Sequence, residues 1–159
     1  MSIVLRYLTP ADCAECRQCC VFDRYGLWDT PVITEENAQA IRALRDDIHF
    51  IGRPDAGYIF NMGQYESGDM CRCPALGAHG CTLDENKPFD CQIWPYMAVR
   101  HEGKIYAAVS ELCPVYSRIP IDALRDEADA LHDILCAAVS AQPGIVRDSE
   151  GCILVKELY

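Results

Sequence analysis

The chain has 159 residues, the length of one ordinary domain, and 50% of them are hydrophobic, which is enough to bury a core. That composition excludes global disorder. Fourteen Lys and Arg against 24 Asp and Glu give a formal net charge of −10. A general nucleic-acid binder is therefore excluded, because such proteins cluster basic residues against phosphate.

The first half of the chain predicts one helix and one short strand. Thr9-Pro10 opens a turn into a cysteine-rich segment that could begin as a helical turn. Thr34 has the character of an N-cap, so we expect a helix to about Arg45, with glutamates in its first turn. Tyr58–Phe60 is an apolar run among glycines and predicts a strand. From Cys71 to Pro95 we expect loop with little regular structure.

The second half predicts a hairpin, a long helix and a second hairpin. Residues 96–100 and 104–109 flank His-Glu-Gly, which is typical of a β-turn. Apolar residues at steps of three and four predict a helix from Pro120 to about Ser140. Residues 145–147 and 152–155 predict a closing hairpin. We therefore expect one α+β domain, 1–159, with two helices, short β-hairpins and an irregular cysteine-rich, metal-binding centre.

Eleven cysteines are unusually many for a chain of this length. The N-terminus does not resemble a signal peptide, because Arg6 interrupts its apolar run, and no stretch approaches the roughly 18 apolar residues of a membrane span. We therefore expect a cytoplasmic protein with no membrane partner, whose thiols are free or bind metal. The alternative is a secreted disulfide protein, in which an odd number of cysteines would leave one thiol unpaired.

The block Cys13-x2-Cys16-x2-Cys19-Cys20 has the spacing of a metal-ligating loop. A two-residue spacer lets two thiolates turn towards one ion, as in zinc knuckles and iron–sulfur loops. Neighbouring residues of an extended segment project oppositely, so Cys19 and Cys20 would not serve one mononuclear site equally. Either they serve two metals, or one of them supports a cluster without binding it.

Four further cysteines follow in separate segments: Cys73-Pro74, Cys81, Cys91 and Cys113-Pro114. The two Cys-Pro pairs resemble the Cys-Pro that closes a ferredoxin ligand set. Cys71 is either a spare ligand or the ligand in place of Cys73. His79 is an alternative mixed ligand in an exposed loop. Cys136 and Cys152 are expected in the core, since free cysteine is often buried.

In order and spacing, these eight cysteines resemble the YkgJ-like family of bacterial cysteine-cluster proteins, described as a zinc- or iron-chelating domain. Its hallmark CxxCxxCC is met at the first block. Its second half is met at Cys73, at Cys81 with Leu83-Asp84, at Lys87-Pro88 with Cys91, and at Cys113. The resemblance spans residues 13–114 and leaves the helix and hairpin of 120–159 outside. Cys71 is an extra cysteine, and Lys87 stands where arginine is usual. The resemblance implies a bound metal.

Three classes of function fit these residues. The first is a metal-binding protein that holds an iron–sulfur cluster, or zinc or iron ions, through the eight cysteines, and the C-x2-C-x2-C and Cys-Pro features favour the iron–sulfur cluster. The second is an iron-dependent enzyme that modifies a peptide or protein, which needs an open coordination position. The third is a zinc-stabilised interaction module with an unidentified protein partner. No nucleotide-binding loop, HExxH motif or Ser/His/Asp order favours another enzyme class.

Overall fold

A computed structural model of the chain describes all residues except 1–2, 4, 24–25, 27–29, 56 and 63–65. The described residues contain four α-helices, where two were expected, and several short sheets, which confirms the α+β class. They fall into two compact units: residues 9–92, and residues 93–159 together with 3–8. We call these the cysteine unit and the sheet unit. The prediction of a single domain stays a prediction.

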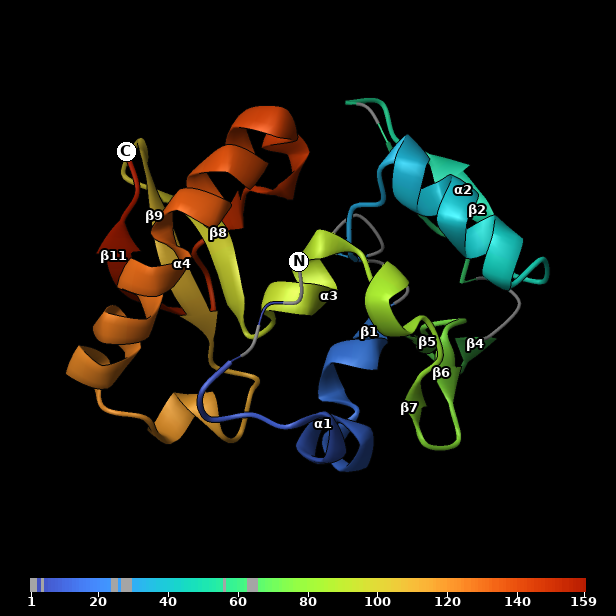
Figure 1. Cartoon of the computed structure of the whole chain (residues 1–159), viewed down its shortest axis with the longest axis horizontal. Coiled ribbons are helices and arrows are strands. Elements are labelled where there is room, and N and C mark those ends of the chain that lie inside the picture. The colour runs from blue at the N-terminus through green and yellow to red at the C-terminus, as the bar shows by residue number, and fades with distance from the viewer. Residues whose placement is uncertain (1–2, 4, 24–25, 27–29, 56, 63–65) are drawn as a thin grey trace. The chain divides into compact units, whose positions relative to one another are not determined.

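The sheet unit is a four-stranded sheet with one long helix packed on it (Figure 1). Its strand order is β10-β8-β9-β11, built from Tyr96–His101 (β8), Lys104–Ser110 (β9), Arg147–Asp148 (β10) and Cys152–Glu157 (β11). The β8–β9 hairpin is confirmed, with Glu102 and Gly103 at positive φ in its turn. The 3-10 helices Tyr116–Arg118 (η5) and Pro143–Ile145 (η6) flank the long helix.

The long helix α4 spans Ile121–Ala141 and confirms the predicted helix almost to the residue. Its buried side chains recur every three or four positions, as an amphipathic helix on a sheet requires: Leu124, Glu127, Ala128, Leu131, Leu135 and Val139. Five of the six are apolar. The sixth, a glutamate, was not predicted to be buried.

The predicted closing hairpin is wrong. β10 pairs in parallel with β8, whereas β11 pairs antiparallel with β9, so the two strands form opposite edges of the sheet. The turn residues between them, Ser149 to Gly151, therefore join two strands that are not neighbours. The sequence pattern identified both strands and assigned them the wrong partners.

The described residues of the cysteine unit form three α-helices and four short strand pairings. Its helices are Pro10–Cys16 (α1), Glu35–Leu44 (α2) and Phe89–Ile93 (α3), the last residue of α3 belonging to the sheet unit. α2 begins after the predicted N-cap, because the Thr34 hydroxyl accepts from the Asn37 N–H at 3.0 Å. Two 3-10 helices lie wholly within the described part of this unit, Gln18–Cys20 (η1) and Asp84–Asn86 (η4).

The strands of the cysteine unit are two or three residues long. β1 (Val21–Asp23), β5 (Met70–Arg72) and β4 (Glu66–Ser67) form one antiparallel sheet in the order β1-β5-β4. β2 (Phe50–Gly52) pairs with β3 (Tyr58–Phe60), and β6 (Leu76–Gly77) pairs with β7 (Gly80–Cys81). The expectation of a loop with little regular structure from Cys71 to Pro95 is wrong, because this segment contains most of β5 and all of β6, β7, η4 and α3.

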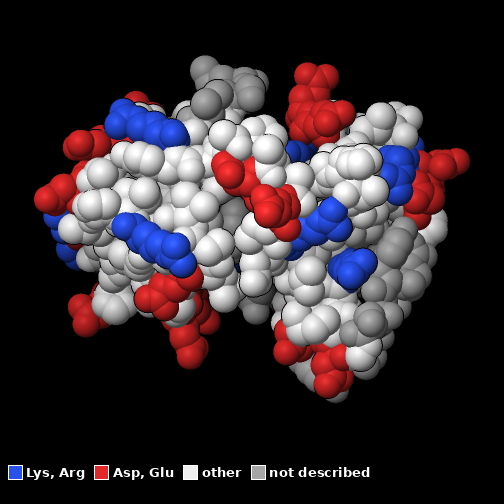
Figure 2. Space-filling view, turned by 90° about the horizontal axis from the view of Figure 1, so that it is seen from below, with Lys and Arg blue, Asp and Glu red and all other residues white. Residues whose placement is uncertain are grey.

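Charged side chains are distributed over the surface. Figure 2 shows Asp and Glu in several separate groups on the face in view, with smaller groups of Lys and Arg among them. Among the described residues, no helix is both long enough and apolar enough to cross a bilayer.

Candidate metal centre

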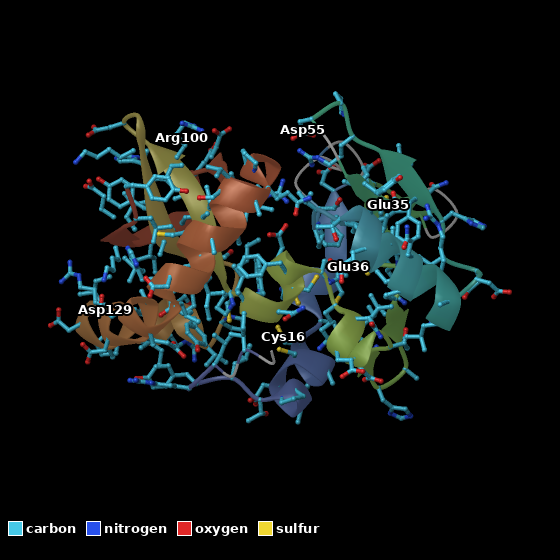
Figure 3. All side chains as sticks on the ribbon, turned by 45° about the horizontal axis from the view of Figure 1, so that its top comes forward. Cys16, Glu35, Glu36, Asp55, Arg100 and Asp129 are labelled. Atoms are coloured by element: carbon cyan, nitrogen blue, oxygen red, sulfur yellow. The ribbon has the colours of Figure 1, made fainter. Side chains whose placement is uncertain are left out.

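The first cysteine block lies on two consecutive helical turns. Thr9 caps α1 by a reciprocal pair of hydrogen bonds with Asp12, and this places Cys13 and Cys16 on one short helix. Arg17 then adopts a left-handed conformation, with φ at 58°, and reverses the chain into η1, which carries Cys19 and Cys20. Cys16 is exposed at the C-terminal end of α1 (Figure 3), and Cys13 is half-buried.

The two adjacent cysteines do not project oppositely. Their segment is a 3-10 helix rather than an extended strand, and their Sγ atoms lie 4.0 Å apart. Two thiolates on one tetrahedral zinc lie about 3.8 Å apart, because each Zn–S bond is about 2.3 Å. The expectation that Cys19 and Cys20 cannot serve one ion equally therefore rested on the wrong local structure.

Backbone contacts join the two cysteine-bearing halves of this unit. The Cys73 N–H donates to the Cys20 carbonyl at 2.8 Å, and it continues the β1–β5 ladder in which Phe22 faces Cys71. Cys20 and Cys73 are 53 positions apart in the chain. The structure thus brings these distant segments together through the main chain.

A second set of contacts holds α1 against the β6–β7 hairpin. The Arg17 guanidinium donates to the Ala78 carbonyl at 2.5 Å and to the Ala14 carbonyl at 2.8 Å. A Cβ placed on Gly80, whose φ is +111°, would lie 3.1 Å from the Cβ of Ala14. The close approach needs glycine, and it brings the helix of Cys13 and Cys16 beside the strand that ends in Cys81.

Four cysteines of this unit interact electrostatically, although they come from four segments. Burial raises the pKa of Cys73 to about 12, with Cys81 and Cys19 adding to the shift. Burial also raises the pKa of Cys91 well above its ordinary value, and Cys73, Asp90, Cys81 and Cys19 raise it further. Thiolates that would crowd one another in this way become compatible when a cation neutralises them.

The pKa of Cys19 is raised as well. Its first cause is the contact with the Cys20 thiol, followed by burial and the charge of Cys20, while Lys87 acts in the opposite direction. Lys87 is one of the residues that carried the family resemblance. It supplies positive charge near Cys19.

The residue types in this unit suit a metal, but its described side chains are not arranged as a complete ligand set. All eleven cysteines are free thiols, and soft thiolates suit zinc, iron and iron–sulfur clusters. Among the residues that the structure describes, however, no three His, Cys, Asp or Glu side chains are arranged to hold one metal ion.

The competing explanation, buried cysteines as small apolar residues, also has support. Cys71 and Cys73 belong to the hydrophobic core of the cysteine unit, and Cys20 and Cys81 pack against it. Cys71 is fully buried on β5, opposite Phe22. His79, the alternative ligand, is exposed in the turn between β6 and β7.

The remaining predicted residues lie in the sheet unit. Cys113 is buried, with 4% of its surface exposed, and its carbonyl accepts from Ser117 N–H at 3.0 Å. Cys136 and Cys152 were expected in the core, but both are only half-buried. Cys152 lies 3.4 Å from the Met97 sulfur, and Cys136 lies beside His132.

Sequence reasoning missed one buried polar cluster of the sheet unit. The Glu127 carboxylate, 3% exposed, accepts from the Arg6 N–H at 2.6 Å and from the Tyr116 hydroxyl at 3.0 Å. The Tyr96 hydroxyl lies 3.3 Å from the same carboxylate and donates to the Leu124 carbonyl at 2.8 Å. The signal was available, because Glu127 lies between Leu124 and Leu131 on the apolar stripe of α4.

No known protein family, curated protein or solved structure matches this chain.

Proposed function

We propose that this protein binds metal through its cysteines, with Cys19, Cys20, Cys73, Cys81 and Cys91 as the central donors. The observation that carries the proposal is geometric: the Cys19 and Cys20 sulfurs lie 4.0 Å apart on η1, and the Cys73 N–H donates to the Cys20 carbonyl at 2.8 Å. The raised pKa values of Cys73 and Cys91, to which Cys19 and Cys81 contribute, agree with it. Cysteines of an apolar core would also come together from several segments, so the serine variants described below distinguish the two explanations. The spacing shared with the YkgJ-like pattern supports the same conclusion.

Charge is a second argument. The chain already carries a formal charge of −10, and each thiolate would add another negative charge to it. Lys87 offsets only part of that charge at Cys19. A bound cation makes the ionised cluster tolerable, because metal and thiolate charges cancel locally.

Cys13 and Cys16 complete the proposed set within the cysteine unit. They lie on α1, which Arg17 and the Ala14–Gly80 contact hold against the β6–β7 hairpin. Exposed Cys16 gives an incoming metal an accessible first thiol. Cys113 lies in the sheet unit, and its role as an eighth ligand stays a prediction of the sequence pattern.

The test is elemental analysis of the full-length protein purified without oxygen, combined with its visible spectrum. We expect metal bound stoichiometrically. A broad band near 400 nm (an approximate position) would identify an iron–sulfur cluster, and a colourless zinc protein would identify zinc. Zinc outcompetes ferrous iron at such sites. If zinc is found after aerobic purification, the metal in the anaerobic sample therefore decides between zinc and iron.

Matched serine variants separate metal binding from packing. Cys91→Ser and Cys19→Ser should lose most of the metal, whereas Cys152→Ser, a half-buried cysteine of the sheet unit, should retain it. Cys113→Ser tests whether that residue belongs to the set. Protein that holds no metal, or variants of Cys19 and Cys91 that bind as much as the parent, would contradict the proposal.

A further inference from the structure

Helix α4 carries a thiol and an imidazole side by side on its solvent-accessible side. His132 and Cys136 are four positions apart, so they lie one above the other on the helix. The Cys136 Sγ lies 3.7 Å from the His132 Nε2 and 4.0 Å from its Nδ1. The His132 side chain is 32% exposed, and Cys136 is half-buried. Both are therefore reachable from solvent.

A carboxylate on the same helix orients the imidazole. The Asp133 Oδ1 lies 3.0 Å from the His132 Nδ1. When the ring proton is on Nδ1 and is donated to Asp133, Nε2 carries the free lone pair. Metal-ligating histidines commonly have this arrangement, because a carboxylate on one ring nitrogen fixes the tautomer and makes the other a better ligand.

The spacing of the two donor atoms suits a chelate. A sulfur and a nitrogen on one tetrahedral zinc lie about 3.6 Å apart, given bonds of about 2.3 and 2.0 Å. The observed distance from Sγ to Nε2 is 3.7 Å. Since Sγ is nearly as close to Nδ1 as to Nε2, it lies to the side of the Nε2 lone pair. The partly exposed ring must therefore rotate about its Cβ–Cγ bond before Nε2 and Sγ can hold one ion.

We propose that His132 and Cys136 form a two-ligand site for a borderline-soft divalent cation such as Zn²⁺. Water fills the other positions, in keeping with the absence of any group of three protein donors among the described residues. The Cys136 thiol loses its proton to solvent as the Zn–S bond forms. This site lies in the sheet unit and is independent of the cysteines proposed above.

The charges around the pair shape its affinity. Asp133 is exposed beside His132, and Asp129, one turn earlier on α4 (Figure 3), pairs with Lys156 of β11. Burial and the charge of Asp133 raise the pKa of Cys136, and Lys156 lowers it. A cation therefore displaces a proton from the thiol when it binds at neutral pH.

The test uses the full chain as purified, with Zn²⁺ added as the only probe. Alkylation of Cys136 by a maleimide, followed on its peptide by mass spectrometry, reports the thiol. The ¹⁵N shift of the His132 Nε2 reports the imidazole. We expect added Zn²⁺ to slow alkylation at least about tenfold and to shift the Nε2 resonance, since a metal-bound thiolate is not free to react.

Variants test the ligand set. His132→Ala should abolish the protection of Cys136, and Cys136→Ser should abolish the Nε2 shift. Asp133→Asn should weaken binding by about tenfold, the usual effect of losing the group that orients a ligand. His101→Ala is the matched control, because the Nδ1 of His101 lies 3.0 Å from the Ser149 hydroxyl oxygen instead of a carboxylate.

Unchanged alkylation at millimolar Zn²⁺ would overturn the proposal. Protection that persists in His132→Ala would also overturn it, because the thiol would then bind without the imidazole. Circular dichroism of each variant verifies the fold, and we expect it unchanged, since neither side chain is part of the buried stripe of α4. Loss of metal from the cysteine unit would leave this result unaffected.

Discussion

Replacing Glu127 should destabilise the sheet unit more than any exposed substitution on α4. Its carboxylate is buried and accepts from the Arg6 N–H and the Tyr116 hydroxyl, and the Tyr96 hydroxyl lies near. Alanine would leave the first two donors without their acceptor. Hydrogen bonds to a charged group contribute about 1.5–3 kcal/mol each. We therefore expect Glu127→Ala to cost about 3–5 kcal/mol.

Two milder variants divide that total. Glu127→Gln keeps the volume and one acceptor oxygen, so it should cost about 1–2 kcal/mol. Tyr116→Phe removes one donor and should cost a similar amount, about 1–2 kcal/mol. Because the two residues share a hydrogen bond, the double variant should be less destabilised than the sum of the single variants.

Urea denaturation followed by circular dichroism gives the free energies, and hydrogen exchange of α4 amides localises them. Asp126→Ala is the control, since this neighbouring carboxylate is exposed and should change stability by no more than about 0.5 kcal/mol. If Glu127→Ala were as stable as Asp126→Ala, the reasoning about this buried cluster would be refuted.

Three further predictions concern the cysteine unit. Gly80→Ala should lower the free energy of unfolding by about 1–3 kcal/mol, because the new Cβ would combine a φ of +111° with a contact at 3.1 Å to Ala14. Gly103→Ala is the control. Its φ is +81° but its surroundings are open, so it should cost less in the same urea titration. The Tyr58 hydroxyl donates to the Glu35 carboxylate at 2.5 Å and lowers the pKa of that carboxyl. The hydrogen bond therefore stabilises the fold at a pH above the pKa that Glu35 has in the unfolded chain. This stabilisation is lost as the pH falls through the lower pKa of the folded state. In Tyr58→Phe, the free energy of unfolding should therefore decrease less steeply below about pH 4.5 than in the parent protein. The same pH dependence in both proteins would contradict this role of the hydrogen bond. Removing metal with a strong chelator should open α1 and the β6–β7 hairpin to proteolysis and reduce the circular dichroism, and an unchanged digestion pattern after verified removal would contradict a structural role.

Local patterns predicted the long elements well. The N-cap at Thr34, the apolar stripe of α4 and the turn at Glu102-Gly103 each depend on residues close together in the chain. Propensity and periodicity are sufficient there, because the helix or hairpin buries one face and the spacing reports which face it is.

Pairing between distant segments could not be predicted in the same way. Nothing near Arg147 indicates that β10 lies in parallel beside β8, and the strands of the cysteine unit are too short for an alternating pattern to show. Cysteine spacing identified the metal-binding candidates. The backbone bond from Cys73 to Cys20 and the 4.0 Å approach of Cys19 and Cys20 required coordinates.

The hydrogen bond between Cys73 and Cys20 has a consequence for how tightly a cation could be held. Joining two points separated by roughly fifty residues costs about 3.5 kcal/mol of chain entropy, apart from a constant. Here the backbone hydrogen bonds between β1 and β5 already hold these two segments together. The entropy of closing the loop therefore need not be lost when an ion binds. If a cation binds as we propose, this prior closure would raise its affinity by a factor of several hundred, at about 1.4 kcal/mol for each tenfold change.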